Sequence, residues 1–229
     1  HTSTHPTSAA SDVYKRQVIP LLNESQSLNE LCNSICEVMS SYGFTYEIIL
    51  IDDGSTDESW EVIQILSKNS ADIKGIKFKR NYGKSQALHA GFLNCNGDVV
   101  FTMDADLQDD PKEIPEMYDM IINDNYDLVS GWKKKRFDSI LFKNIPSKIF
   151  NFAARVTSGI KLNDFNCGLK AYKKDVVKNI NVYGEMHRYI PVLAKNEGYH
   201  KIGEKIVNHR PRKHAVSYTH LTLPTIGCV

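Results

Sequence analysis

Residues 104–111, Asp-Ala-Asp-Leu-Gln-Asp-Asp-Pro, have the residue types and spacing of a site for a divalent cation. Asp104 and Asp106 follow an apolar run at residues 98–103, which predicts a buried strand. Carboxylates this close repel each other unless a cation or hydrogen bonds compensate. A hard divalent ion carrying a diphosphate would compensate, because such ions prefer oxygen ligands. The alternative is a solvated acidic loop. A calcium loop of the EF-hand type is disfavoured, because Asp109 stands where glycine is required.

Polar side chains also follow two earlier predicted strands, which end near residues 20 and 51. These side chains are Asn23, Glu24, Asp52 and Asp53. Ligands of open α/β sheets bind at the carboxyl ends of the strands, so all three polar strand ends should meet at one edge. Asp53 or Glu24 could there accept hydrogen bonds from a base or a ribose. Each motif alone also fits a turn with a helix cap, and the conjunction of the three is what predicts a nucleotide site.

The elements that must position these residues alternate along the chain. Helical spacing predicts helices over residues 25–42, 56–68, 84–94 and 111–123. Strands are predicted over residues 46–51, 73–78, 98–103 and 126–130. Pro111 suits the first turn of its helix. Alternation of this kind predicts an α/β fold with a mostly parallel central sheet and helices on both faces.

The composition fits one catalytic domain. The chain has 229 residues, of which 41% are hydrophobic, enough for a sizeable core. A net charge of +1 argues against general nucleic-acid binding, and no run approaches the roughly 18 apolar residues of a membrane span. The five cysteines form no zinc-site pattern, and we expect reduced thiols in a cytosolic protein.

The two ends of the chain differ in character from the rest. Residues 1–17 are polar without a usable period, and the composition changes again over residues 215–229. Parts of both ends resemble translated sequencing linker. We therefore predict a single domain over residues 18–214, with non-native or disordered ends at residues 1–17 and 215–229. Residues 17–20 are then the tail of a strand whose beginning is missing.

Taken in order, the motifs resemble those of the family 2 glycosyltransferases, whose nucleotide-sugar-binding fold is of the GT-A type. The resemblance runs from residue 18 to about residue 214. It includes Val-Ile-Pro-Leu-Leu-Asn-Glu (18–24), Asp-Asp-Gly-Ser-Thr-Asp (52–57), Arg-Asn-Tyr-Gly-Lys-Ser (80–85) and the acidic stretch at residues 104–111. Residues 164–171, 184–189 and 208–212 add likeness to the polyprenyl-phosphate branch, that of dolichol-phosphate mannose synthases and bactoprenol glucosyltransferases.

The resemblance implies a nucleotide-sugar half over residues 18–132 and an acceptor half over residues 133–214. The nucleotide-sugar would be bound by Pro20, Asn23, Glu24, Asp52, Asp53, Lys84, Asp104 and Asp106. A Mg²⁺ or Mn²⁺ ion would be held by Asp104, Asp106 and Gln108. The catalytic residues would be Asp106, Asp164, Glu185 and Arg188. The acceptor phosphate would meet Lys133, Arg188, Arg210 and Arg212. Asp164 and Glu185 could equally be structural hydrogen-bond acceptors, and His187 a structural histidine.

The implied reaction is metal-dependent transfer of a sugar, with inversion, from a UDP- or GDP-linked donor to undecaprenyl or dolichyl phosphate. Its place would be the cytoplasmic face of a membrane, and the whole protein could carry C-terminal transmembrane helices. Two departures matter: Trp132-Lys133 stands where relatives often have Ser-Arg, and residues 215–219 replace an expected Gly-x-Ser-Lys-Tyr. The alternatives are a nucleotide-sugar-binding fragment without turnover and a nucleotidyltransferase or dinucleotide enzyme. No Gly-x-Gly-x-x-Gly follows the first strand, which counts against a dinucleotide site.

Residues 133–155 combine basic and apolar side chains at helical spacing. Four consecutive basic residues, 133–136, precede an apolar stripe with further lysines and an arginine. This pattern is typical of an amphipathic helix lying on an anionic membrane. An ordinary surface helix packed on the sheet would show the same pattern, so both interpretations stay open.

Overall fold

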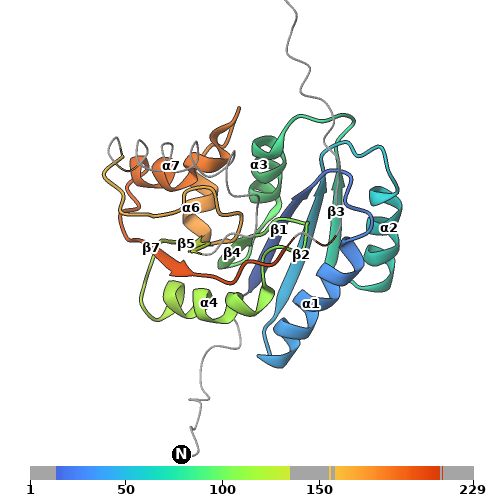
Figure 1. Ribbon diagram of the computed structural model, residues 1–229, viewed down its shortest axis with the longest axis horizontal. Helices are drawn as coiled ribbons and strands as arrows, with labels where there is room; N and C mark the ends of the chain where they lie inside the picture. The colour runs from blue at the N-terminus through green and yellow to red at the C-terminus, as the bar shows by residue number, and fades with distance from the viewer. Residues whose placement is uncertain (1–13, 135–154, 156–157, 212, 214–229) are drawn as a thin grey trace, which may run out of the picture.

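The computed structural model describes residues 14–134, 155, 158–211 and 213. Its central sheet has seven strands in the order β3-β2-β1-β4-β6-β5-β7 (Figure 1). The strands are β1 Lys15–Leu21, β2 Tyr46–Asp52, β3 Ile73–Lys77, β4 Val99–Thr102, β5 Leu128–Trp132, β6 Lys170–Lys173 and β7 Ile202–Ile206. The helices are α1 Leu28–Ser41, α2 Ser59–Asn69, α3 Lys84–Asn94, α4 Ile114–Ile122, α6 Lys174–Asn179 and α7 Ile190–Asn196. Two 3-10 turns, η1 Pro111–Glu113 and η2 Met186–Tyr189, precede α4 and α7.

The sheet is mostly parallel, as the alternating pattern predicts. Strand β1 runs parallel to both of its neighbours, β2 and β4, and β2 runs parallel to β3. Only β6, among the strands described, runs against its neighbours β4 and β5. The polar residues that follow β1, β2 and β4 therefore emerge at the same edge of the sheet.

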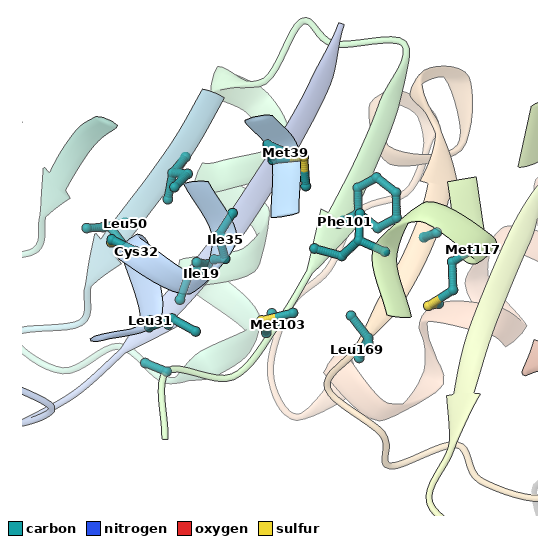
Figure 2. Packing of buried hydrophobic residues seen from close by; sticks show 14 of the residues in the cluster. Ile19, Leu31, Cys32, Ile35, Met39, Leu50, Phe101, Met103, Met117 and Leu169 are labelled. Carbon is teal, nitrogen blue, oxygen red and sulfur yellow. The ribbon is translucent and has the colours of Figure 1, made fainter. Parts of the chain in front are cut away.

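Helices cover both faces of the sheet, which confirms that part of the predicted fold. Helices α1, α2 and α4 pack on one face, where Ile35 and Met117 meet strand residues such as Phe101 (Figure 2). Helices α3, α6 and α7 pack on the other face, around Val18 and Tyr172. Successive strand residues alternate between these two cores, because side chains of a strand point to opposite faces.

Most predicted elements lie within a few residues of their expected ends, and α3 has the predicted bounds. The first strand differs, because it begins at Lys15, which lies inside the segment at residues 1–17 that was predicted to be a non-native or disordered end. Lys15, Arg16 and Gln17 pair with β2 and β4 in a continuous ladder. The boundary at residue 18 therefore falls within a strand. Pro111 opens η1 rather than α4 itself, and the Asp110 carboxylate accepts the Lys112 N–H at 3.1 Å there.

Two further expectations concern membranes and thiols. None of the helices in the described ranges is long and apolar enough to cross a bilayer. Cys32, Cys36, Cys95 and Cys167 are free thiols. The basic amphipathic pattern at residues 133–155 lies almost wholly outside the described residues.

Candidate active site

A cleft of about 320 Å³ opens at the carboxyl ends of β1, β2 and β4. Six residues predicted to bind a nucleotide-sugar line it: Pro20, Glu24, Asp53, Lys84, Asp104 and Asp106. Because the three strands are parallel, side chains more than 80 positions apart in the sequence meet here. We call this the main cleft.

Asp53 holds the loop that leads into α3 while it lines the main cleft. Its two carboxylate oxygens accept the backbone N–H groups of Tyr82 at 2.8 Å and Gly83 at 2.9 Å. Burial raises the pKa of Asp53, and these two hydrogen bonds oppose the rise. A carboxylate offers about four acceptor positions, so capacity remains for a ligand.

Asn23 and Asp52 shape the turns beside the cleft and are not among the residues that line it. The Asn23 side-chain oxygen accepts the Thr56 N–H at 2.8 Å. Asp52 is fully buried, and its Oδ1 accepts the Ser55 N–H at 2.8 Å. Gly54, with φ +76°, completes this turn, where a Cβ would collide with the Arg80 backbone. A nucleotide-binding role for Asn23 and Asp52 stays a prediction.

Asp104 forms an ion pair with Lys84, and both residues line the main cleft. Burial alone would raise the pKa of Asp104, but the charges of Lys84 and Lys133 outweigh it and hold the pKa at about 2. Burial likewise opposes the charge of Lys84, yet Asp104 raises the pKa of that ammonium. Both groups are therefore ionised near neutral pH.

Residues 104–110 form a loop that we call the acidic loop. Within it, the Gln108 N–H donates to Asp106 Oδ1 at 3.1 Å, and Leu107 adopts a positive φ of 63°. The segment after β7 lies alongside, because the Arg210 N–H donates to the Gln108 carbonyl at 2.9 Å. The Arg210 guanidinium pairs with Asp110 at 2.7 Å. Arg210, predicted to meet the acceptor phosphate, thus helps to hold the acidic loop.

Lys133 also supports this loop. Its ammonium lies 2.9 Å from Asp109 Oδ1, and the carboxylate of Asp109 is fully buried. Burial would lower the pKa of Lys133, but the neighbouring groups, Asp109 above all, raise it above its usual value. The lysine that stands in place of an arginine therefore points into the domain, whereas the next residue, Lys134, is exposed.

A second, narrower cavity adjoins the main cleft and shares Pro20, Lys84 and Asp104 with it. Its other walls include Gly168, Lys170, His187 and Arg188. A Cβ at Gly168 would lie 2.5 Å from the Asp104 carboxylate, so a residue without a side chain is needed there. Lys170 is 4% exposed, and its ammonium donates to the Cys167 carbonyl. Burial lowers the pKa of Lys170.

Of the functional residues predicted in the acceptor half, the structure places only some at the two cavities. Arg188 lines the second cavity. Asp164 is buried, lines neither cavity, and accepts the Asn166 N–H at 3.0 Å. The Glu185 side chain is 90% exposed. Arg212 lies outside the described residues.

Lys170 is a functional candidate that the sequence analysis missed. Lys170 belongs to the motif at residues 164–171, which was used only for the family resemblance. Its local sequence resembles the start of an ordinary strand. The sequence offers only a lysine directly after Cys-Gly-Leu as a signal. That this lysine lies beside the acidic loop follows from the pairing of β4 with β6, which the sequence does not reveal.

The donor groups at the main cleft suit a hard divalent cation. No cluster of three or more His, Cys, Asp or Glu side chains able to hold a metal occurs in the described part of the chain. Asp104 and Asp106 instead offer two carboxylates at one wall. This set fits Mg²⁺ or Mn²⁺, which commonly bind one or two carboxylates and take further oxygens from substrate phosphates and water.

The family model described as "Glycosyl transferase family 2" matches residues 17–180, more than half of the chain. The chain belongs to glycosyl transferase family 2. The match covers the main cleft, the acidic loop and Lys170, and it confirms the family that the sequence motifs resemble.

Curated relatives of this family 2 chain are similar to it over most of its length. A dodecaprenyl-phosphate galacturonate synthase of Rhizobium johnstonii is 37% identical over 202 residues, 87% of this chain and 60% of the relative. An undecaprenyl-phosphate 4-deoxy-4-formamido-L-arabinose transferase of Pseudomonas savastanoi is 38% identical over 201 residues, 87% of this chain and 59% of the relative. The chain thus spans about three fifths of the length of these relatives.

Solved structures confirm the GT-A fold. Glucosyl-3-phosphoglycerate synthase from Mycobacterium tuberculosis, crystallised with Mn²⁺ and UDP-glucose, superposes with a TM-score of 0.68 at 19% identity. The superposition covers 91% of this chain and 78% of the other. At that level of identity the likeness concerns the fold.

Proposed function

We propose that this family 2 domain transfers a sugar from a nucleotide-sugar to a polyprenyl phosphate, with a divalent metal ion and with inversion at the anomeric carbon. The observation that carries the proposal is the main cleft, where Asp53, Lys84 and the carboxylates of the acidic loop converge. Asp53 lies on the side where β2 ends, and Asp104 and Asp106 lie where β4 ends. This arrangement suits a nucleoside at one end and its diphosphate at the other.

The relatives support the acceptor class. Both curated relatives carry a polyprenyl phosphate in their names, one together with galacturonate and the other together with an arabinose derivative. The sugars differ between the two relatives. We therefore propose the class of acceptor, and for the donor we propose a UDP- or GDP-linked sugar without naming the sugar. The Mn²⁺ and UDP-glucose of the structural neighbour are compatible with a metal-bound diphosphate at the acidic loop.

The metal, held by Asp104 and Asp106 with Gln108 nearby, would neutralise charge on the departing nucleoside diphosphate. The acceptor oxygen is already anionic, so a strong general base is less necessary than for a hydroxyl acceptor. The bond from this oxygen to the anomeric carbon forms as the bond to the diphosphate breaks. A single displacement of this kind inverts the anomeric carbon. Lys84 and Arg188 add positive charge on the acceptor side.

A transfer assay tests the proposal. The chain is incubated with UDP- and GDP-linked sugars, a short polyprenyl phosphate and Mg²⁺ or Mn²⁺, and lipid-linked sugar is measured by mass spectrometry. We expect product with at least one donor and none after EDTA is added. Nucleotide binding without any product would favour the alternative, a binding fragment without turnover. Product formation undiminished by EDTA would contradict the metal requirement.

An acceptor with a membrane-embedded chain places the reaction at a membrane surface, which we propose is the cytoplasmic face. Lys133 cannot serve as a membrane contact, because it pairs with the buried Asp109. We therefore expect the triple change Lys134→Gln, Lys135→Gln and Arg136→Gln to reduce binding to anionic vesicles, since each cation near such a surface adds about 1 kcal/mol. Co-sedimentation measures this. Equal binding to neutral and anionic vesicles would instead support an ordinary surface helix.

A further inference from the structure

Ser85 and His187 join two segments that are distant in sequence, and His187 lines the second cavity. Ser85 is the second residue of α3, and His187 lies in η2. The His187 N–H donates to Ser85 Oγ at 3.0 Å, and Ser85 Oγ lies 3.2 Å from His187 Nδ1. Ser85 is 1% exposed, so these hydrogen bonds are sheltered from water. We call these two residues the Ser85–His187 pair.

The chemistry of the pair suits a fixed contact. Burial first, and then the nearby charges of Lys84 and Arg188, lower the pKa of His187 to about 4. The imidazole is therefore neutral near pH 7. Ser85 Oγ already accepts the backbone N–H, and its own proton can be donated to Nδ1. One hydroxyl thus holds both the backbone and the ring of His187.

Each member of the pair is next in sequence to a basic residue that lines the second cavity. Lys84 precedes Ser85, and Arg188 follows His187; both cations line the cavity, as does Lys170. Lys84 is engaged by Asp104 and Lys170 by the Cys167 carbonyl. The Arg188 guanidinium makes no ion pair or hydrogen bond within the part of the chain that the structure describes. It is the cation available to an incoming anion.

We propose that Ser85 and His187 are positioning residues that hold Arg188 opposite Lys84 and so set the affinity of the second cavity for the acceptor's phosphate head. The proposal rests on the proposed function and adds two residues that act through Arg188. An exposed arginine loses side-chain freedom when it binds an anion, and fixing its backbone beforehand reduces that cost. Both hydrogen bonds of the pair act on the residue next to Arg188.

The test compares Ser85→Ala with the unaltered protein. We expect the KM for a short polyprenyl phosphate to rise about tenfold, because both hydrogen bonds are lost, while kcat and the KM for the nucleotide-sugar stay within about twofold. Hydrogen exchange of the His187 amide should be faster in the variant without substrate. Ser67→Ala is the matched control, because the Ser67 hydroxyl is buried on α2 without a hydrogen-bond partner among described residues.

Two histidine variants separate positioning from direct contact. His187→Ala should raise the acceptor KM, and His187→Asn should restore most of the affinity, because the Asn oxygen can take the place of Nδ1. An acceptor KM in Ser85→Ala equal to that of the unaltered protein would overturn the proposal. So would unchanged hydrogen exchange of the His187 amide, or an Asn variant as weak as the Ala variant. If the unaltered protein transfers no sugar to any polyprenyl phosphate, the proposed function itself fails, which is a different result.

Discussion

At the residue scale, the acidity of His187 depends on every charged group that faces it. Lys84, Arg188 and Lys170 disfavour its protonated form, and Asp104 favours it. The exposed Glu185 carboxylate lies 3.8 Å from Nδ1. Burial and the three cations prevail, so the pKa falls from the usual 6.5 to about 4. The folded protein therefore binds this proton more weakly than the unfolded chain does.

A pH dependence of stability follows from that pKa. Between about pH 6.5 and pH 4 the unfolded chain takes up a proton that folded His187 resists, so the free energy of unfolding falls as the pH falls. After allowance for solvent screening, we expect this histidine to account for about 1 to 2 kcal/mol. Urea unfolding of the unaltered protein and of His187→Asn at pH 7 and pH 4.5 measures it. An identical loss of stability in both proteins would contradict the assigned pKa.

Adjacent residues can also differ in ways that no sequence pattern reveals. Asp52 and Asp53 end the same strand and were both predicted to bind the nucleotide-sugar. The structure buries Asp52 under the turn at Ser55 and places Asp53 at the cleft. Identical side chains one position apart point to opposite sides of a strand, and their partners come from loops that are distant in sequence.

At the element scale, the first half of β1 carries polar side chains where a central strand usually has apolar ones. Gln17 is fully buried; its amide nitrogen lies 3.9 Å from the Met39 sulfur, and its oxygen has no hydrogen-bond partner among the described residues. Lys15 is 1% exposed, with its ammonium 4.1 Å from the centre of the Phe44 ring. Cation–π contact offsets part of the cost of burying Lys15, but Gln17 has no comparable compensation.

Replacing Gln17 should therefore stabilise the domain. Gln17→Met keeps the approximate volume and removes an unsatisfied polar group, which costs about 1–3 kcal/mol when buried. We expect the free energy of unfolding to rise by about 1 kcal/mol, as measured by urea denaturation. Gln64→Met on the exposed side of α2 is the control and should change little. A decrease in stability with Gln17→Met would show that the amide is satisfied in the folded state.

The elements that could be predicted are those with long periodic patterns. Helix α3 has its predicted bounds, and strands β2 and β4 were placed within about a residue. Strand β6 has the sequence Lys-Ala-Tyr-Lys and only four residues, so it offers no apolar run to detect. The second cavity could not be predicted for the same reason, because Lys170 reaches it through β6 and His187 through a short 3-10 turn.

At the scale of the whole molecule, the acidic loop is where the two halves of the domain meet. It follows β4 in the first half, and three contacts from the second half hold it: Lys133 on Asp109, Arg210 on Asp110, and Gly168 against Asp104. The loop that carries the carboxylates we propose as metal ligands is thus held by residues of the proposed acceptor half. This arrangement would couple the site for the donor diphosphate to the site for the acceptor phosphate.

The measurement that tests this account most directly is sugar transfer by Asp106→Asn. The change removes one negative charge at the main cleft and keeps the shape of the side chain. We predict that kcat for transfer falls on the order of 10²–10³-fold, the usual effect of losing one electrostatic stabiliser, while the melting temperature stays the same. Asp175→Asn, an exposed carboxylate at the start of α6, is the control and should transfer normally. Near-normal transfer by Asp106→Asn in the presence of Mg²⁺ or Mn²⁺ would contradict the account.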